Sequence, residues 1–227
     1  MERKKTAVLI SGQHLQAEGW DEVMWGDPSV GREGRIARGL IEALRWDAEM
    51  IGFGTGASER DGKKEADIIY EYAQEHISTL PAFSDLEDPS GWLAERAVID
   101  RVTQNTREEV KAAAEIAISR GIERIVLVSS PTHIFRAHQS ALSLFSSDER
   151  FGNLAHELYA VSSDVPYAGA TVDDVVIIEP PHRGDLPRIL FHTNAKRIFQ
   201  FLKDADVARG FNDAWGILID EWKKKLL

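Results

Sequence analysis

The stretch IVLVSSPTHIFRA, residues 125–137, combines the pattern of a β-strand with that of a helix start. Residues 125–128 form a short apolar run, as in strands that are buried on both faces of a parallel sheet. Small and hydroxyl residues and a proline end the run, and a helical pattern then extends from His133 to about Phe145. The stretch therefore predicts a buried parallel strand, a tight turn and a helix.

The same order of strand, turn and helix recurs along the chain. Further strands are predicted at residues 6–10, 48–53, 97–100, 158–161 and 175–178. Further helices are predicted at residues 31–46, 63–77 (with Asp61 as a candidate cap), 105–120, 195–202 and 211–226. Strands that alternate with helices form right-handed βαβ units. We therefore expect a three-layer α/β fold, with a mainly parallel sheet and helices on both of its faces.

The composition fits one α/β domain that spans residues 1–227. With 43% hydrophobic residues, a chain of this length can bury a core without disulfides. The sequence has no cysteine, which excludes a disulfide framework, a cysteine nucleophile and a thiolate metal site. Prolines, a glycine and acidic residues break every period around residues 79–96, which predicts a surface loop or lid. Residues 193–227 are expected to form a helical appendage that packs on its own sheet or serves as a docking surface.

The net charge of −10 bears on the partners of the protein. An acidic chain is repelled by nucleic acid phosphates and by anionic lipid, so we expect neither as a partner. No apolar run approaches the roughly 20 residues that span a bilayer. These features predict a cytoplasmic protein, a monomer or homodimer, whose partner is a small molecule.

Polar and small residues gather at the predicted ends of the strands. Parallel α/β sheets bind ligands beyond the carboxyl ends of their strands, and the helix N-termini there favour anions. The candidate ligand-binding residues are Ser11, Gly12, Gln13, His14, Gly54, Thr55, Gly56, Asn105, Thr106, Ser129, Ser130, Thr132, Glu179, His182 and Arg183.

The candidate catalytic residues are His133, Glu65 and Arg136. His133 and Arg136 are three positions apart, so they share one face of the first helical turn and together can hold a phosphate or a carboxylate. His133 can also act as a general acid or base, with Glu65 or Glu179 as its partner carboxylate.

Simpler interpretations remain open for several of these residues. Asn105 and Glu108 have the spacing of a helix capping box, and Ser130 or Thr132 can serve as a cap. The glycines at 54 and 56 fit a turn, because no GxGxxG or Walker pattern is present. Neither an HExxH pattern nor a GxSxG elbow occurs, so the sequence predicts no metal site and gives little support to a serine hydrolase.

Four short segments resemble the YdcF/SanA/ElyC family, a bacterial domain of unknown function. The signature of this family begins with an apolar strand. It continues with Thr or Ser, then Ser, a gap of two residues, His, a second gap of two residues, and Arg-Ala. Residues 126–137 are similar to this signature. The other matching segments are Asn105-Thr106-Arg107-Glu108-Glu109, Gly54-Thr55-Gly56-Ala57 and Glu65-Ala66. The resemblance covers roughly residues 6–145.

The resemblance implies a Rossmann-like fold with a cleft at the strand ends. The matching cleft positions are Glu65, Asn105, Thr106, Ser130, His133 and Arg136. One branch of the family binds S-adenosylmethionine, and others act on the bacterial envelope through an anchored N-terminus. Residues 11–14, Ser-Gly-Gln-His, replace the glycine-rich turn that the family usually carries after its first strand.

Three functions are consistent with these observations. The first is a hydrolase or group-transfer enzyme that acts on a small anionic or nucleotide-like metabolite, with His133 as acid or base and Arg136 as the anion clamp. The second is a protein that binds S-adenosylmethionine or a related nucleoside without turnover. The third is a protein–protein interaction module.

Overall fold

The computed structural model describes residues 3–169. The chain divides into two compact units, residues 1–177 and 178–227, and the described residues belong to the first. The predicted strand at 175–178, the predicted helices at 195–202 and 211–226, and the appendage at 193–227 lie outside the described residues.

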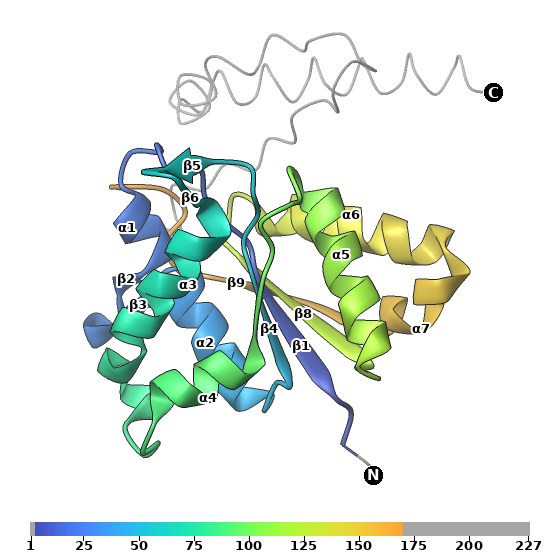
Figure 1. Cartoon of the computed structure of the whole chain (residues 1–227), viewed down its shortest axis with the longest axis horizontal. Helices are drawn as coiled ribbons and strands as arrows, with labels where there is room; N and C mark the ends of the chain where they lie inside the picture. Colours follow the sequence, from blue (N-terminus) through green and yellow to red (C-terminus); the bar gives the residue numbers. More distant parts are fainter. Residues whose placement is uncertain (1–2, 170–227) are drawn as a thin grey trace, which may run out of the picture. The chain divides into compact units, whose positions relative to one another are not determined.

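Five parallel strands form the central sheet, in the order β7-β4-β1-β8-β9 (Figure 1). Every one of the five strands coincides with a predicted strand. β1 lies in the middle, and its Val8 stands opposite Ile51 of β4 and Val126 of β8. The bounds are β1 Thr6–Ile10, β4 Met50–Phe53, β7 Ala97–Ile99, β8 Arg124–Ser129 and β9 Leu158–Ser162.

Helices cover both faces of the sheet, which confirms the expected three-layer, Rossmann-like α/β fold (Figure 1). Successive residues of a strand point to opposite faces, so Val8 and Ile10 pack in one core cluster and Ala7 and Leu9 in another. The first cluster lies against α1 Trp20–Met24, α2 Arg35–Arg45, α3 Glu65–His76 and α4 Pro89–Arg96. The second lies against α5 Thr106–Ser119, α6 Ile134–Ser147 and α7 Gly152–Ala155.

Short elements connect these layers. Two antiparallel hairpins pair β2 Gly26–Asp27 with β3 Arg32–Glu33 and β5 Glu59–Arg60 with β6 Lys63–Lys64. Single 3-10 turns span Pro28–Val30, Ile77–Thr79, Pro81–Phe83 and Glu149–Phe151. Within residues 3–169, no helix combines the length and apolarity needed to cross a membrane.

The strand order reverses direction between β1 and β8. The chain adds β4 and then β7 on one side of β1, and it adds β8 and then β9 on the other side. At such a switch point the chain segments that follow the two strands run to opposite faces of the sheet. This leaves a crevice at the carboxyl ends of the two strands. The crevice between β1 and β8 is therefore where the fold favours a ligand.

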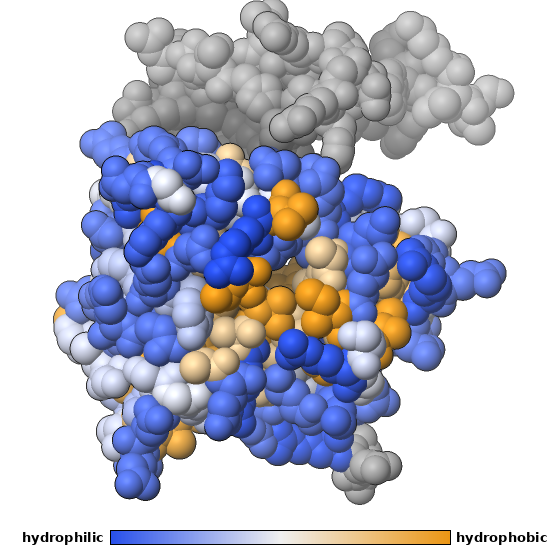
Figure 2. All heavy atoms as spheres, viewed as in Figure 1, coloured by the Kyte–Doolittle hydropathy of each residue, from blue (hydrophilic) through white to orange (hydrophobic). Residues whose placement is uncertain are grey.

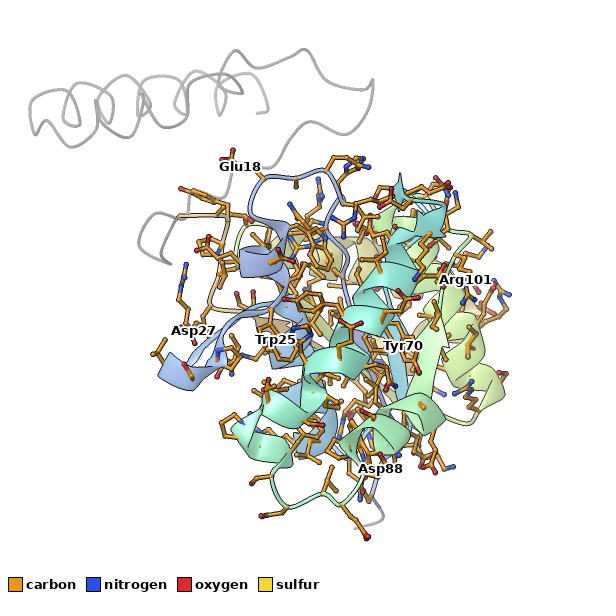
Figure 3. The ribbon with its side chains drawn as sticks, turned by 60° about the vertical axis from the view of Figure 1, so that its left-hand side comes forward. Glu18, Trp25, Asp27, Tyr70, Asp88 and Arg101 are labelled. Atoms are coloured by element: carbon orange, nitrogen blue, oxygen red, sulfur yellow. The ribbon has the colours of Figure 1, made fainter. Side chains whose placement is uncertain are left out.

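Residues 79–96 differ from the prediction of a loop or lid. Asp88 caps α4 by accepting a hydrogen bond from the Gly91 backbone N at 2.8 Å, and Pro89 occupies the first helical position. Proline is favoured there because its missing N–H has no partner in a first turn. Arg96 donates to the Ala48 carbonyl just before β4, at 3.1 Å, so this segment lies at the amino ends of the strands. Figure 3 shows Asp88 near the bottom of the view and Arg101, which follows β7, higher up on its right-hand side.

One other local prediction is wrong. Asp61 does not cap α3, because it occupies the β5–β6 turn with φ 52° beside Gly62 with φ 78°. Two positive φ angles are typical of the Asp-Gly turn of a tight hairpin. Trp20 and Trp25, in the polar segment after β1, are buried in the core cluster that α2 and α3 also join.

The strand β7 lies at one edge of the sheet among the described residues. Its three residues are only half-buried. Figure 2 shows apolar residues gathered in the middle of the viewed face, between the α3 side and the α5 side.

Gly39 gives a test of the packing between α2 and β1. A Cβ at Gly39 would overlap Cγ1 of Ile10, which is fully buried in the central strand. We expect Gly39→Ala to lower the free energy of unfolding by about 1–3 kcal/mol, although alanine favours helix.

The matched control is Gly152→Ala, where an added Cβ meets no atom within 4 Å and the backbone is already helical, with φ −52°. This change is expected to be neutral or to stabilise by under about 1 kcal/mol. Urea unfolding measures both, and equal effects of the two changes would contradict the packing described here.

Candidate functional site

Arg35 joins the two sides of the crevice. It is the first residue of α2, and only 4% of it is exposed. Its guanidinium donates to the Gly12 carbonyl, to Gln13 Oε1 at 3.1 Å and to Ser130 Oγ at 2.7 Å. Gly12 and Gln13 follow β1 and Ser130 follows β8, so these bonds cross the switch point. The sequence analysis missed Arg35.

The charge of Arg35 is not neutralised by direct contact. It forms no ion pair with a carboxylate of residues 3–169, and its buried Nε has no hydrogen-bond partner there. Burial lowers the pKa of Arg35 to about 10, although Glu109 and Glu65 act in the opposite direction. Arg35 therefore remains a cation at neutral pH and contributes positive potential to the crevice.

Glu65 lies on the other side of Gly12. It is the first residue of α3 and is 4% exposed, and it accepts hydrogen bonds from Ser58 Oγ at 2.6 Å and Thr55 Oγ1 at 3.4 Å. A Cβ on residue 12 would overlap Glu65 Oε1, so only glycine admits this carboxylate. Burial raises the pKa of Glu65, and the two hydroxyls and the nearby His14 oppose that shift.

His133 is held between two hydroxyl groups at the N-cap of α6. Its Nδ1 lies 2.9 Å from Ser129 Oγ, and its Nε2 lies 3.4 Å from Thr106 Oγ1. Burial, followed by the positive charges of Arg35 and Arg136, lowers the pKa of His133 to about 3. His133 is therefore a neutral imidazole at neutral pH. Ser129 is fully buried, so its hydroxyl orients the ring and is not an accessible nucleophile.

Arg136 is the accessible cation of the site. It is exposed in the first turn of α6 and forms no ion pair or hydrogen bond with residues 3–169. After burial, which is the largest cause, its charge contributes to lowering the pKa values of Arg35 and His133. The predicted pair of His133 and Arg136 thus shares one side of the crevice.

Glu109 is a second residue that the sequence analysis did not select. It lies in the first turns of α5, is 9% exposed, and its carboxyl forms no hydrogen bond within the described residues. Burial raises the pKa of Glu109 well above its usual range, and Glu65 and Asp100 add to that shift while Arg35 opposes it. The protonated form of Glu109 is therefore favoured relative to that of an exposed glutamate.

Several predicted ligand-binding residues have structural partners. Asn105 accepts from the Glu108 backbone N at 3.1 Å and caps α5. Thr132 donates to the Pro166 carbonyl at 3.2 Å. Gly54 has φ 50° and packs on Ala66, and Gly56 packs against the Arg101 carbonyl, so both glycines serve the turn after β4.

The remaining predicted residues are distributed as follows. The buried Ser11 offers its carbonyl to Arg35 at 3.4 Å, and His14 is exposed. Glu179, His182 and Arg183 lie outside the described residues. Of the described part of the chain, no three His, Asp or Glu side chains are placed to share a metal ion.

A cavity of about 420 Å³ lies at the opposite end of the sheet. Its lining residues precede β1, β8 and β9 or belong to α5 and α7, and they include Lys4, Glu123 and His156. None of the predicted site residues lines it. Because parallel α/β sheets bind ligands at the carboxyl ends of their strands, we place the candidate site at the crevice.

The protein was compared with known proteins in three ways. No family model matches the chain, no curated protein matches it, and no solved structure matches it. The resemblance to the YdcF/SanA/ElyC family therefore stays a prediction.

Proposed function

We propose that the crevice binds the phosphate or carboxylate of a small anionic or nucleotide-like metabolite and supports hydrolysis or group transfer at that group. The observation that carries the proposal is that two guanidiniums, Arg35 and Arg136, both act on His133, and neither forms an ion pair within residues 3–169. Arg35 is buried and Arg136 is exposed, and an anion bound beside both would offset the repulsion between their positive charges.

The residues have separate roles in this proposal. Arg136 contacts the anionic oxygens, because its guanidinium is exposed and can bind two of them at once. Arg35 is a positioning residue that holds the Gly12–Gln13 backbone and Ser130 in place. The first turns of α5 and α6 add backbone dipoles that favour negative charge at the same place.

His133 is the proton acceptor for an attacking water or hydroxyl. The neutral ring has one unprotonated nitrogen that can accept a proton, and a hydroxyl of Ser129 or Thr106 lies beside that nitrogen in either tautomer. An anion bound at Arg136 offsets the repulsion from the two guanidiniums and raises the pKa of His133. Binding of a phosphate dianion is therefore expected to be coupled to proton uptake.

Calorimetry with inorganic phosphate and AMP tests the site. We expect both to bind, with proton uptake revealed by comparing buffers of different ionisation enthalpy. Arg136→Ala is expected to weaken binding roughly 10- to 100-fold, since a charge-assisted hydrogen bond contributes about 1.5–3 kcal/mol. Arg120→Ala, an exposed arginine at the far end of α5, is the control. Absence of binding, or equal binding by the Arg136 variant, would show that the proposal is wrong.

A protein that binds a nucleoside such as S-adenosylmethionine without turnover is the second candidate. The complete burial of Ser129 favours it, because the serine nearest to His133 is not an accessible nucleophile. Binding of AMP or S-adenosylmethionine with no phosphate release from any phosphate ester would support this candidate over the enzyme.

A further inference from the structure

The two edges of the sheet differ in how well they are protected against a further strand. Within residues 3–169, β7 forms one edge and β9 the other. An open edge can pair with another strand unless charges, proline, a bulge or a short length prevent it. β7 is protected, because it has only three residues and lies between the charged Arg96 and Asp100. The N–H of Ala97 is also in use, since it donates to the Leu93 carbonyl at the end of α4.

The strand β9 has none of these protections. It has five residues, Leu-Tyr-Ala-Val-Ser, without a charge or a proline. Its register against β8 is unbroken from Leu158 to Ser162, so it contains no bulge. Ala160 and Ser162 are exposed, and 40% of Tyr159 is exposed. The outer edge of β9 is therefore open to a further strand.

The backbone of β9 offers both donors and acceptors along this open edge. The Ile125 N–H of β8 donates to the Glu157 carbonyl at 3.0 Å, so alternate residues from Glu157 onward direct their backbone groups to β8. The residues between them, Leu158, Ala160 and Ser162, direct their N–H and C=O groups outward. These outward groups form no hydrogen bond within residues 3–169.

The path of the chain after β9 leads away from the open edge. Residues 163–169 are held on the side of α1 and α2, where Asp164 accepts from Arg38 at 2.8 Å and the Gly169 N–H donates to Glu22 at 3.1 Å. The connection from β8 to β9 runs through α6, on the other face of the sheet. Another parallel strand beyond β9 would need a right-handed crossover on that same α6 face. The direction of the described chain therefore favours a strand from a second molecule.

The open edge of β9 is complementary to itself. In an antiparallel pair of two copies centred on Ala160, the outward groups of Ala160 meet those of the same residue, and Leu158 meets Ser162. Each outward N–H then faces an outward C=O. The same register places Tyr159 of each copy opposite Val161 of the other, and a pair of an aromatic and a β-branched residue stabilises a sheet.

Tyr159 is already positioned for such a contact. Its ring centroid lies 5.2 Å from that of Trp46, and the guanidinium of Arg124 lies 5.5 Å from the Tyr159 ring. Because these contacts hold the ring within one copy, association costs little side-chain freedom at this position.

We propose that β9 is the interface of a homodimer, in which two copies pair antiparallel around a two-fold axis at Ala160 and join their sheets into one. A two-fold interface uses the same surface of both copies and is closed, so no third copy adds to it. This inference goes beyond the proposed function and does not depend on the anion site, because the interface lies at the edge of the sheet.

Sedimentation equilibrium of the full chain tests the proposal, with the variants Ala160→Lys and Ala160→Glu. We expect the unaltered protein to be a dimer. Each variant alone brings two like charges together at the axis, which should weaken dimerisation at least about 100-fold. An equal mixture of the two variants should dimerise again, because opposite charges then meet. Ser143→Lys, at an exposed position on α6, is the control and should dimerise like the unaltered protein.

The mixture also separates loss of the interface from loss of the fold, because a misfolded variant would not regain association. Hydrogen exchange adds a second readout: the amides of Leu158, Ala160 and Ser162 should be protected in the dimer and should exchange freely in Ala160→Lys. A dimer that Ala160→Lys leaves intact would overturn the proposal. An unaltered protein that stays monomeric at about 1 mM would also overturn it. If the three amides are protected in that monomer, residues beyond 169 of the same chain cover the edge instead.

Discussion

Replacing Arg35 by alanine is expected to lower the free energy of unfolding by about 3–5 kcal/mol. The change leaves the carbonyls of Ser11 and Gly12 and the side chains of Gln13 and Ser130 without their shared donor, in a region that water reaches poorly. At about 2–4 °C per kcal/mol for a chain of this size, the melting temperature should fall by roughly 10 °C.

Differential scanning calorimetry measures this effect. Arg35→Lys should recover less than half of the loss, because an ammonium cannot reproduce the planar set of donors. Arg120→Ala, at an exposed position, should leave the melting temperature within about 1 °C, as surface changes usually do. A loss below about 1 kcal/mol in Arg35→Ala would contradict the central role given to this residue.

His133 is expected to make the protein less stable as the pH falls from about 6.5 toward 5. Its pKa is 6.5 in the unfolded chain and about 3 in the folded protein, so the unfolded state binds more protons between these values. Stability rises with pH wherever the unfolded state binds more protons. The titration of His133 alone should therefore lower the free energy of unfolding by about 1.4 kcal/mol for each pH unit below 6.5, or by about 2 kcal/mol at pH 5.

The variant His133→Gln isolates this contribution. Glutamine keeps a hydrogen-bonding group but does not titrate, so the difference between the unaltered protein and the variant should shrink by about 2 kcal/mol from pH 7 to pH 5. His156→Gln, at an exposed position, is the matched control. Parallel stability profiles of the unaltered protein and His133→Gln would show that His133 is not the buried neutral group described here.

The sequence predicts the sheet and most helices because their signals are local. The apolar run at 125–128 and the Asn105 cap each involve a few neighbouring residues, and both occur as predicted. The error at 79–96 has a local cause too, because Pro89 was interpreted as a helix breaker when it starts α4. Its position in the first turn is decided by Asp88, one residue earlier.

The candidate site was only half predictable, because its charges depend on distant elements. The spacing of His133 and Arg136 places them on one helical turn, and the structure agrees. Arg35 looks like an ordinary surface residue in the sequence, and only the packing of α2 beside β1 buries it. The neutral state of His133 follows from that burial and from Arg35, almost a hundred positions away, and so no local pattern could indicate it.

The position of β1 in the sheet has a consequence for the newly made chain. Thr6 pairs with Arg124 of β8, so the central strand obtains its second neighbour only after more than half of the chain has been synthesised. Until then, an apolar strand meant for burial on both faces has one open edge, which is a risk for aggregation on the ribosome. Chains that stop before residue 124 should therefore depend on chaperones far more than the chain of 227 residues does.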